Sequence, residues 1–231
     1  MKKLLLASTL ALGLVSGLFA DNITFTSING GAAAGSPKIN FDNLDLGSAT
    51  QAVNADLTVS FSGGAAVVQP PNVSGVYAAP FVSGDNGLGF GSPDQPFGAD
   101  TTRFLSTGIG SITLQFASSQ RYFGLLWGSV DDYNTLSFYN GTTLLQSFTG
   151  ADIWASANGD QGQQGTFYVN FNDLDGAFDK VVATSSGFAF EFDNVAYNAN
   201  PRNVPDGGAT IALLGFACAG LIAFRRRQRR A

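Results

Sequence analysis

The chain of 231 residues contains no histidine. Without an imidazole, Ser-His-Asp triads, Cys-His dyads and the common zinc sites are excluded. The single cysteine, Cys218, lies in an apolar segment near the C-terminus, so the rest of the chain has neither a disulfide nor a thiol nucleophile. Only one glutamate is present, Glu191, and every other acidic residue is an aspartate. These absences exclude the commonest nucleophilic and zinc-dependent enzymes.

Basic residues are scarce between the two ends of the chain. Residues 21–203 contain five basic and sixteen acidic side chains, which gives a net charge of −11. An acidic surface of this kind repels nucleic acid and anionic lipid, so neither is expected as a partner. It is compatible with cation binding and with solubility outside the cell.

The N-terminus has the pattern of a secretory signal peptide. Lys2 and Lys3 precede an apolar stretch over residues 4–19, and the small residue Ala20 follows it. Residues 1–20 are therefore expected to be removed by signal peptidase before Asp21. The alternative is a signal anchor that stays in place.

The C-terminus combines a breaker-rich motif, an apolar run and a cationic end. Val204, Pro205, Asp206, Gly207 and Gly208 precede sixteen uncharged residues, 209–224, and an arginine-rich tail follows at 225–231. At about 1.5 Å per residue the run spans about 24 Å as a helix, slightly less than a hydrocarbon core of about 30 Å. The pattern predicts a transmembrane helix with a cytoplasmic arginine tail. The alternative is a buried C-terminal core helix.

The order and spacing of these three parts resemble the PEP-CTERM sorting signal in its VPDGG-type variant. That resemblance covers residues 204–230 and implies that a bacterial exosortase cuts near the motif. Val204 to Gly208 would then be part of a substrate, and the membrane contact through the C-terminal helix would be transient. The resemblance further implies a Gram-negative cell that makes exopolysaccharide. The protein would pass through the inner membrane to the cell surface or the extracellular space.

Residues 21–198 show alternation of apolar and polar side chains in place of helical periodicity. Apolar residues at every second position place one side of each segment against a core. The pattern recurs in residues 23–25, 57–61, 112–116 and 167–171. We predict an all-β ectodomain, a jelly-roll-like antiparallel sandwich of two sheets, with the rings of the chain's twenty phenylalanines in its core. A polar linker, residues 199–203, follows it.

Turn signals separate these segments. Asn140-Gly141 predicts a tight hairpin, because both residue types accept a positive φ. Residues 69–102 are rich in Pro and Gly, and we expect a structured loop over one sandwich edge because its aromatic residues can hold it in place. Those residues are Tyr77, Phe81, Phe90 and Phe97. The loop over residues 151–165 is rich in Gly, Gln and Asn and is expected to be solvated.

Two further blocks carry a second resemblance. Residues 121–141 and 188–195 are similar to a subfamily of exosortase-dependent surface proteins whose ectodomain looks like a lectin or carbohydrate-module sandwich. The resemblance implies export and surface display, and it supplies no catalytic residues.

Asp42 and Asp193 lie in near-identical contexts, Phe-Asp-Asn, at opposite ends of the ectodomain. The first and last strands of a jelly roll are often neighbours, so the two carboxylates are candidates for a Ca²⁺ site, and Ca²⁺ is the only cofactor that the sequence suggests. The alternative is turn chemistry at each strand end. Asp173, Asp175 and Gly176 are expected to form a solvated turn, and we favour a turn over a cation site at Asp131 and Asp132.

Aromatic and acidic residues suggest two ways of acting on carbohydrate. Trp127 and Trp154 are candidates to stack on sugar rings, although a place in the core is the commoner outcome for such residues. Glu191 with an aspartate would be needed for a glycosidase pair. Since Glu191 alternates with Phe190 and Phe192, we expect it on the opposite, solvated face.

The sequence therefore favours a non-catalytic surface or extracellular-matrix protein, processed by an exosortase and associated with exopolysaccharide or biofilm. The alternative is a calcium-supported carbohydrate-binding module that binds extracellular polysaccharide. A glycoside hydrolase is the least favoured interpretation.

Overall fold

The computed structural model describes residues 22–28, 30–91 and 94–201. The predicted signal peptide, sorting motif and transmembrane run lie outside these residues. Within the described ranges, no helix has the length and apolar character needed to cross a membrane.

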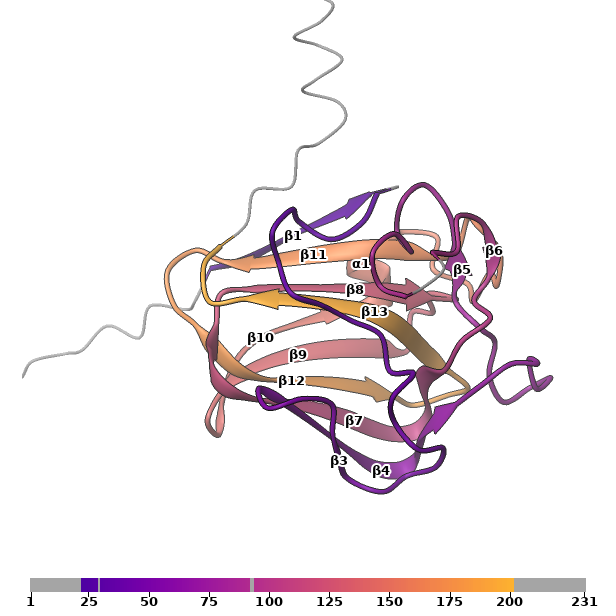
Figure 1. Cartoon of the computed structure of the whole chain (residues 1–231), viewed down its shortest axis with the longest axis horizontal. Helices are drawn as coiled ribbons and strands as arrows, with labels where there is room; N and C mark the ends of the chain where they lie inside the picture. Colours follow the sequence, from indigo (N-terminus) through magenta and orange to yellow (C-terminus); the bar gives the residue numbers. More distant parts are fainter. Residues whose placement is uncertain (1–21, 29, 92–93, 202–231) are drawn as a thin grey trace, which may run out of the picture.

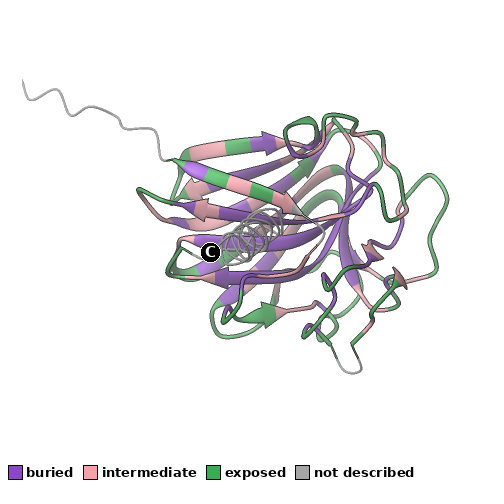
Figure 2. Ribbon diagram, turned by 90° about the horizontal axis from the view of Figure 1, so that it is seen from above, coloured by how far each residue is buried: buried purple, intermediate pink, exposed green. Residues whose placement is uncertain are grey.

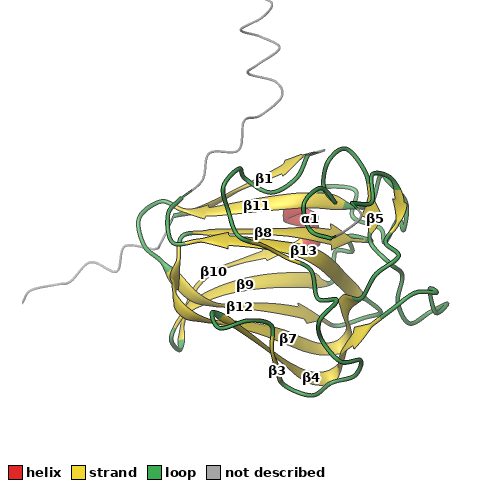
Figure 3. Ribbon diagram, in the orientation of Figure 1, coloured by secondary structure: helices red, strands yellow, loops and turns green. Residues whose placement is uncertain are grey.

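The described chain is almost entirely β-structure, which confirms the predicted all-β class (Figure 3). Strands form where β-branched and aromatic residues alternate with polar ones, and Gly, Asn and Asp separate them. The elements are β1 (Ile23–Ile28), β2 (Lys38–Ile39), β3 (Gln51–Ala52), β4 (Leu57–Val68), β5 (Phe81–Val82), β6 (Gly98–Ala99), β7 (Phe104–Gln120), β8 (Tyr122–Gly128), β9 (Asn134–Asn140), β10 (Thr143–Thr149), α1 (Gly150–Ile153), β11 (Phe167–Asp173), β12 (Phe178–Ser185) and β13 (Phe190–Asn198).

The main strands form one antiparallel sheet of eleven strands within the described residues, in place of the two sheets that we predicted. Its path runs β1-β11-β8-β13-β7-β12-β9-β10. The long strand β7 joins the two halves, because its first residues pair with β13 and its later residues pair with β12 (Figure 1). The sheet curls until its two ends approach each other, with the rings of Phe25 and Phe148 only 5.3 Å apart. The result is a nearly closed, barrel-like sandwich.

Phenylalanine rings fill the interior of this sheet. Phe138 on β9 is fully buried, and its ring centroid lies 5.0 Å from those of Phe171 and Phe178. Phe123 and Phe148 each lie 6.0 Å from it. Edge-to-face and tilted rings at these distances are favourable beyond their burial alone. Buried segments lie mostly in the strands, and loops carry much of the exposed surface (Figure 2).

The central strands β8 and β13 are buried on both faces. A second apolar cluster, which includes Tyr122, Leu126 and Tyr168, lies on the outer face of the sheet. Val82 and Phe90 also belong to it, and both lie within residues 69–91 and 94–102, which we call the covering segment. Loops that pack on a sheet in this way turn an outer face into a second interior.

The covering segment is ordered, as predicted, and aromatic contacts hold it. Tyr77 packs edge-on against Phe104 at 5.7 Å, and Phe90 lies 6.0 Å from Tyr168. Phe81 packs against Phe97 at 5.0 Å, although Phe97 itself remains 64% exposed. Strands β5 and β6 pair within this segment, near the ends of β8 and β13 (Figure 1).

The hairpin and the solvated loop are both found where they were predicted. The hairpin is confirmed: Asn140 pairs with Thr143, and Gly141 takes a φ of 59° at the first position of the turn. Residues 151–165 are mostly exposed, as predicted, although they are not a bare loop. They include most of the short helix α1, in which Ile153 is buried, and Gly165 accepts a backbone hydrogen bond from Val130 at 2.9 Å.

We predict that Phe138→Ala destabilises the protein by about 3–5 kcal/mol, because it leaves a cavity among four phenylalanine rings. Leu144→Ala is the matched control on the same hairpin, since Leu144 is 52% exposed. It should cost about 0.5 kcal/mol or less. Urea unfolding of both variants measures the difference, and equal losses would contradict this packing of the core.

Candidate functional site

Two buried carboxylates lie on the outer face of β13, beneath the covering segment. Phe190 and Phe192 point into the core, so Glu191 and Asp193 point to the opposite face, as the alternation predicts. The expected solvation of Glu191 is wrong, however. Only 2% of Glu191 and none of Asp193 is exposed, because the covering segment packs over this face.

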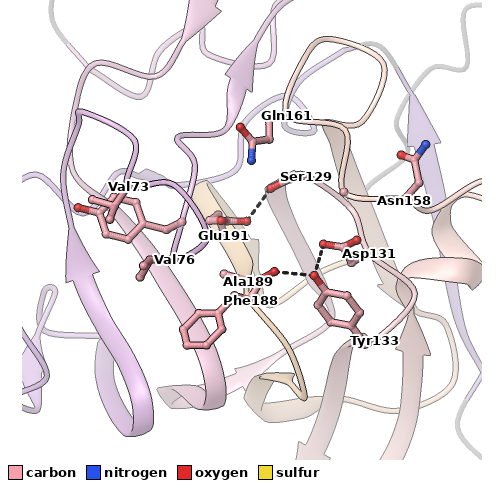
Figure 4. A pocket seen from close by; sticks show the side chains of 13 residues that line it. Val73, Val76, Ser129, Asp131, Tyr133, Asn158, Gln161, Phe188, Ala189 and Glu191 are labelled. Atoms are coloured by element: carbon pink, nitrogen blue, oxygen red, sulfur yellow. Dashed lines mark hydrogen bonds between the residues drawn. The ribbon is translucent and has the colours of Figure 1, made fainter.

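Glu191 accepts two hydrogen bonds inside its enclosure. The hydroxyl of Ser129 donates to Oε2 at 2.6 Å (Figure 4). The backbone N–H of Ala78 donates to Oε1 at 2.8 Å. Burial raises the pKa of Glu191 to about 7, against the lowering effect of these hydrogen bonds, and the charge of Asp131 adds to the rise. Ser129 itself has a φ of 37°, which is unusual outside glycine. The site therefore holds a carboxyl group that titrates near neutral pH.

A second polar group lies beside it. The Tyr133 hydroxyl lies 2.7 Å from Oδ2 of Asp131 and 2.6 Å from the carbonyl oxygen of Phe188. A phenol has one proton and donates it to only one acceptor at a time. Burial raises the pKa of Asp131, the Tyr133 hydrogen bond lowers it, and neighbouring Asp132 raises it again. When Asp131 is protonated, its carboxyl donates to Tyr133 and the phenol donates to Phe188.

These groups line an open cleft of about 200 Å³ at one end of the sheet. Val73 and Val76 of the covering segment form one wall, and the loop after α1 contributes Asn158 and Gln161 (Figure 4). The loop after α1 thus contributes to the cleft, although we predicted it only as a solvated segment. The cleft has no signal in the sequence, because its walls come from segments without periodicity.

Phe188 gives this cleft an exposed aromatic ring. The side chain is 55% exposed, and it lies against the backbone of Gly108 on β7. A Cβ atom at position 108 would lie 2.4 Å from a ring carbon of Phe188, so the glycine is what allows this close approach. The ring is supported by the sheet on one side and is accessible to solvent elsewhere.

The two tryptophans do not provide such a ring. Trp127 is fully buried and stacks on Phe190, with ring centroids 4.3 Å apart. The stacking role predicted for it does not fit this position, because no part of its ring reaches the surface. Trp154 is half-buried against Phe167, and it does not line the cleft.

The second buried carboxylate, Asp193, has Asp100 as its nearest acidic partner. Burial raises the pKa of Asp193 well above its usual range, followed by the charge and close approach of the Asp100 carboxyl. Asp42 acts more weakly on it. The charge of Asp42 thus acts on Asp193, the other predicted cation ligand. Strand β2, which precedes Asp42 and pairs with β13, brings it near, in place of the first strand. Sequence reasoning missed Asp100, which lies in the Pro/Gly-rich region without a motif.

Asp42 itself is exposed, and its oxygens have partners. The backbone N–H of Arg103 donates to Oδ1 at 3.0 Å, and the Asn40 amide donates to Oδ2 at 2.7 Å. At the other acidic turn, Asp173 accepts hydrogen bonds from the backbones of Asp175 and Gly176. The turn is as predicted, but Asp173 is buried and not solvated.

The sorting motif lies outside the described residues, so the comparisons with known proteins bear on it. Residues 203–228 match the model of the VPDSG-CTERM motif. The chain carries an exosortase-type sorting signal. Gly207 stands where the name of the motif has serine. A VPDSG-CTERM signal of this PEP-CTERM-like kind implies an exported protein.

The remaining comparisons add little. No curated protein matches the chain. Among solved structures, a mutant of the family 29 carbohydrate-binding module CBM29-2 is 12% identical, with a TM-score of 0.27, and the match covers 78% of this chain and 93% of that one. A likeness this weak supports no conclusion about the fold or the ligand of this protein.

We predict that protonation of Glu191 makes the protein more stable at acidic pH. Its pKa in the folded state lies above the unfolded value, so the folded state binds more protons between about pH 4.5 and pH 7. Stability from this group is therefore complete below about pH 4.5 and is lost as the pH rises through 7. The loss is about 3 kcal/mol.

Glu191→Gln is the control, because its amide can accept from Ala78 and donate to Ser129. Denaturant unfolding from pH 4 to 8 should show a shallower pH dependence in this variant than in the wild type. Parallel curves for the two proteins would show that Glu191 is not the group that titrates.

Proposed function

We propose that this protein is a non-catalytic, exported surface or extracellular-matrix protein, processed by an exosortase and associated with exopolysaccharide. The observation that carries this proposal is the VPDSG-CTERM match over residues 203–228. The signal-peptide pattern of residues 1–20 supports it from the other end of the chain. In this proposal Val204 to Gly208 are substrate residues, and the apolar run halts the chain in the inner membrane until it is cut.

The composition of residues 21–203 suits this role. The domain has no cysteine, so its folding does not depend on the redox state of the compartment. Its net charge of −11 keeps it soluble and disfavours anionic partners. The charge is therefore compatible with a neutral polysaccharide and disfavours an anionic one.

The cleft supports glycan binding as a second, finer function. Phe188 presents a ring held against Gly108, and polar groups of Asn158, Gln161 and Glu191 line the same cleft. Ligand sites commonly combine apolar surface with a few fixed polar groups, and a sugar ring has both an apolar face and hydroxyl edges. We propose Phe188, in place of the predicted tryptophans, as the surface on which a sugar stacks.

We predict that replacing Pro205 and Asp206 together by alanine prevents processing in a host that has an exosortase. The mature protein should then retain residues 209–231, which mass spectrometry of the membrane fraction detects directly. Asn200→Ala, only a few residues upstream, should be processed normally. A double variant that is cut as efficiently as the wild type would show that the motif is not the recognised sequence.

We predict that Phe188→Ala weakens binding to a neutral polysaccharide about tenfold or more, which is about 1.4 kcal/mol. Phe97→Ala is the matched control, because Phe97 is also exposed and does not line the cleft. Glycan arrays followed by titration calorimetry measure both. Equal affinities would remove Phe188 from the site, and release of reducing sugar would indicate hydrolysis in place of binding.

A further inference from the structure

The carboxylate of Asp193 is fully buried, and neither Oδ1 nor Oδ2 has a hydrogen bond of good geometry in the part of the chain that the structure describes. Polar groups that act on it include the backbone of Asn194 and the carboxyl of Asp100. A buried carboxylate without a donor is costly, because it loses its hydration and gains nothing in return. A proton or a cation held between Asp193 and Asp100 would satisfy it.

Asp100 brings a second carboxylate to the same place. Only 4% of Asp100 is exposed, and its carboxyl is the group that acts most strongly on Asp193. The backbone N–H and the hydroxyl of Thr102 both donate to Oδ1 of Asp100, at 2.8 and 2.7 Å. Two carboxylates in contact repel each other unless a proton or a cation lies between them.

The basic side chains nearby have other partners. Lys38 donates to the carbonyl oxygen of Leu88 at 2.6 Å, and its ammonium lies 5.0 Å from the centre of the Phe90 ring. The Arg103 guanidinium donates to the carbonyl oxygens of Asp42 and Leu44. Neither cation neutralises the pair, and the exposed Asp42 adds further negative charge.

A small cavity lies beside the pair. It measures about 30 Å³ and is lined by the polar residues Asn40, Gln95, Asp100, Thr102 and Asn194 together with Val82 and Phe90, and Asp193 lies next to Asn194 in the chain. A space of this size holds one ion or one water molecule. Asn194 has a φ of 51°, at the irregularity where β13 changes its pairing with β8. Such bulges redirect side chains, and this one lies directly after Asp193.

The donor set selects the kind of ion. Only oxygen atoms are present, since the ectodomain has no histidine and no cysteine. No three acidic, histidine or cysteine side chains gather as a metal group anywhere in the described ranges, so amide, carbonyl and water oxygens would have to complete the shell. Ca²⁺ takes six to eight oxygens in irregular geometry, whereas Mg²⁺ demands a near-ideal octahedron.

We propose that the carboxylates of Asp100 and Asp193 bind Ca²⁺ beneath the covering segment and attach it to β13. Asp100 belongs to the segment and Asp193 to the strand, so one ion joins residues 93 positions apart in the chain. This inference does not depend on glycan binding in the cleft, which is lined by a different set of residues.

The direct test is thermal unfolding of the full chain, first freed of metal by a chelator and then titrated with CaCl₂. We expect the melting temperature to rise with Ca²⁺ and then saturate, by on the order of 5 °C, with a smaller rise for Mg²⁺. Terbium luminescence sensitised by Tyr or Trp gives a second readout, and Ca²⁺ should quench it by competition. A wild-type melting temperature that is the same with Ca²⁺ and with chelator overturns the proposal.

The Asp193→Asn variant distinguishes Ca²⁺ binding from a proton shared between the two carboxyl groups. If Ca²⁺ binds, the variant loses the Ca²⁺-dependent rise, while Asp56→Asn, an exposed control, retains it. If the two carboxyls merely share a proton, Asp193→Asn is at least as stable as the wild type and neither protein responds to Ca²⁺. Should Asp193→Asn fail to fold, the wild-type titration still decides the matter alone.

Discussion

The packing of the covering segment on the outer face of β13 is the constraint on which the rest of the structure depends. It buries Glu191 and Asp193, which would otherwise be ordinary surface carboxylates of a strand. The raised pKa of Glu191 follows from this cover, since burial is its largest cause. One wall of the cleft, and Asp100 and Thr102 at the small cavity, also come from the same segment. Both candidate sites therefore exist only while this segment stays in place.

The sorting signal and the ectodomain occupy different parts of the sequence. The sorting signal at residues 203–228 implies export, and in the proposed function the ectodomain makes the contacts outside the cell. An exported domain without disulfides needs another means of holding a long loop on a sheet. Aromatic contacts such as Tyr77 with Phe104 provide part of it, and a cation between two buried aspartates would provide more. In this protein the covering segment needs this support, and the same segment lines both the cleft and the small cavity.

Alternation in the sequence was sufficient to predict the all-β class and the faces of β13. It placed Phe190 and Phe192 inside and Glu191 opposite them, which the structure confirms. It was wrong on the environment of Glu191, because the hydrogen bond from Ala78 spans 113 positions and leaves no local pattern. Asp100 was missed for the same reason, because its proximity to Asp193 joins distant parts of the chain and leaves no local pattern. Trp127 illustrates the opposite error, since a large ring on a strand buried on both faces belongs to the core.

The most direct measurement is hydrogen exchange at the amides that tie the covering segment down. The N–H of Ala78 donates to Glu191, and the N–H of Phe81 donates to the hydroxyl of Thr166, outside the segment, at 3.3 Å. If the segment closes over this face of β13, both amides should be protected to nearly the same degree as those of β8 and β13. Exchange of both at the rate of unprotected, solvent-exposed amides would contradict it.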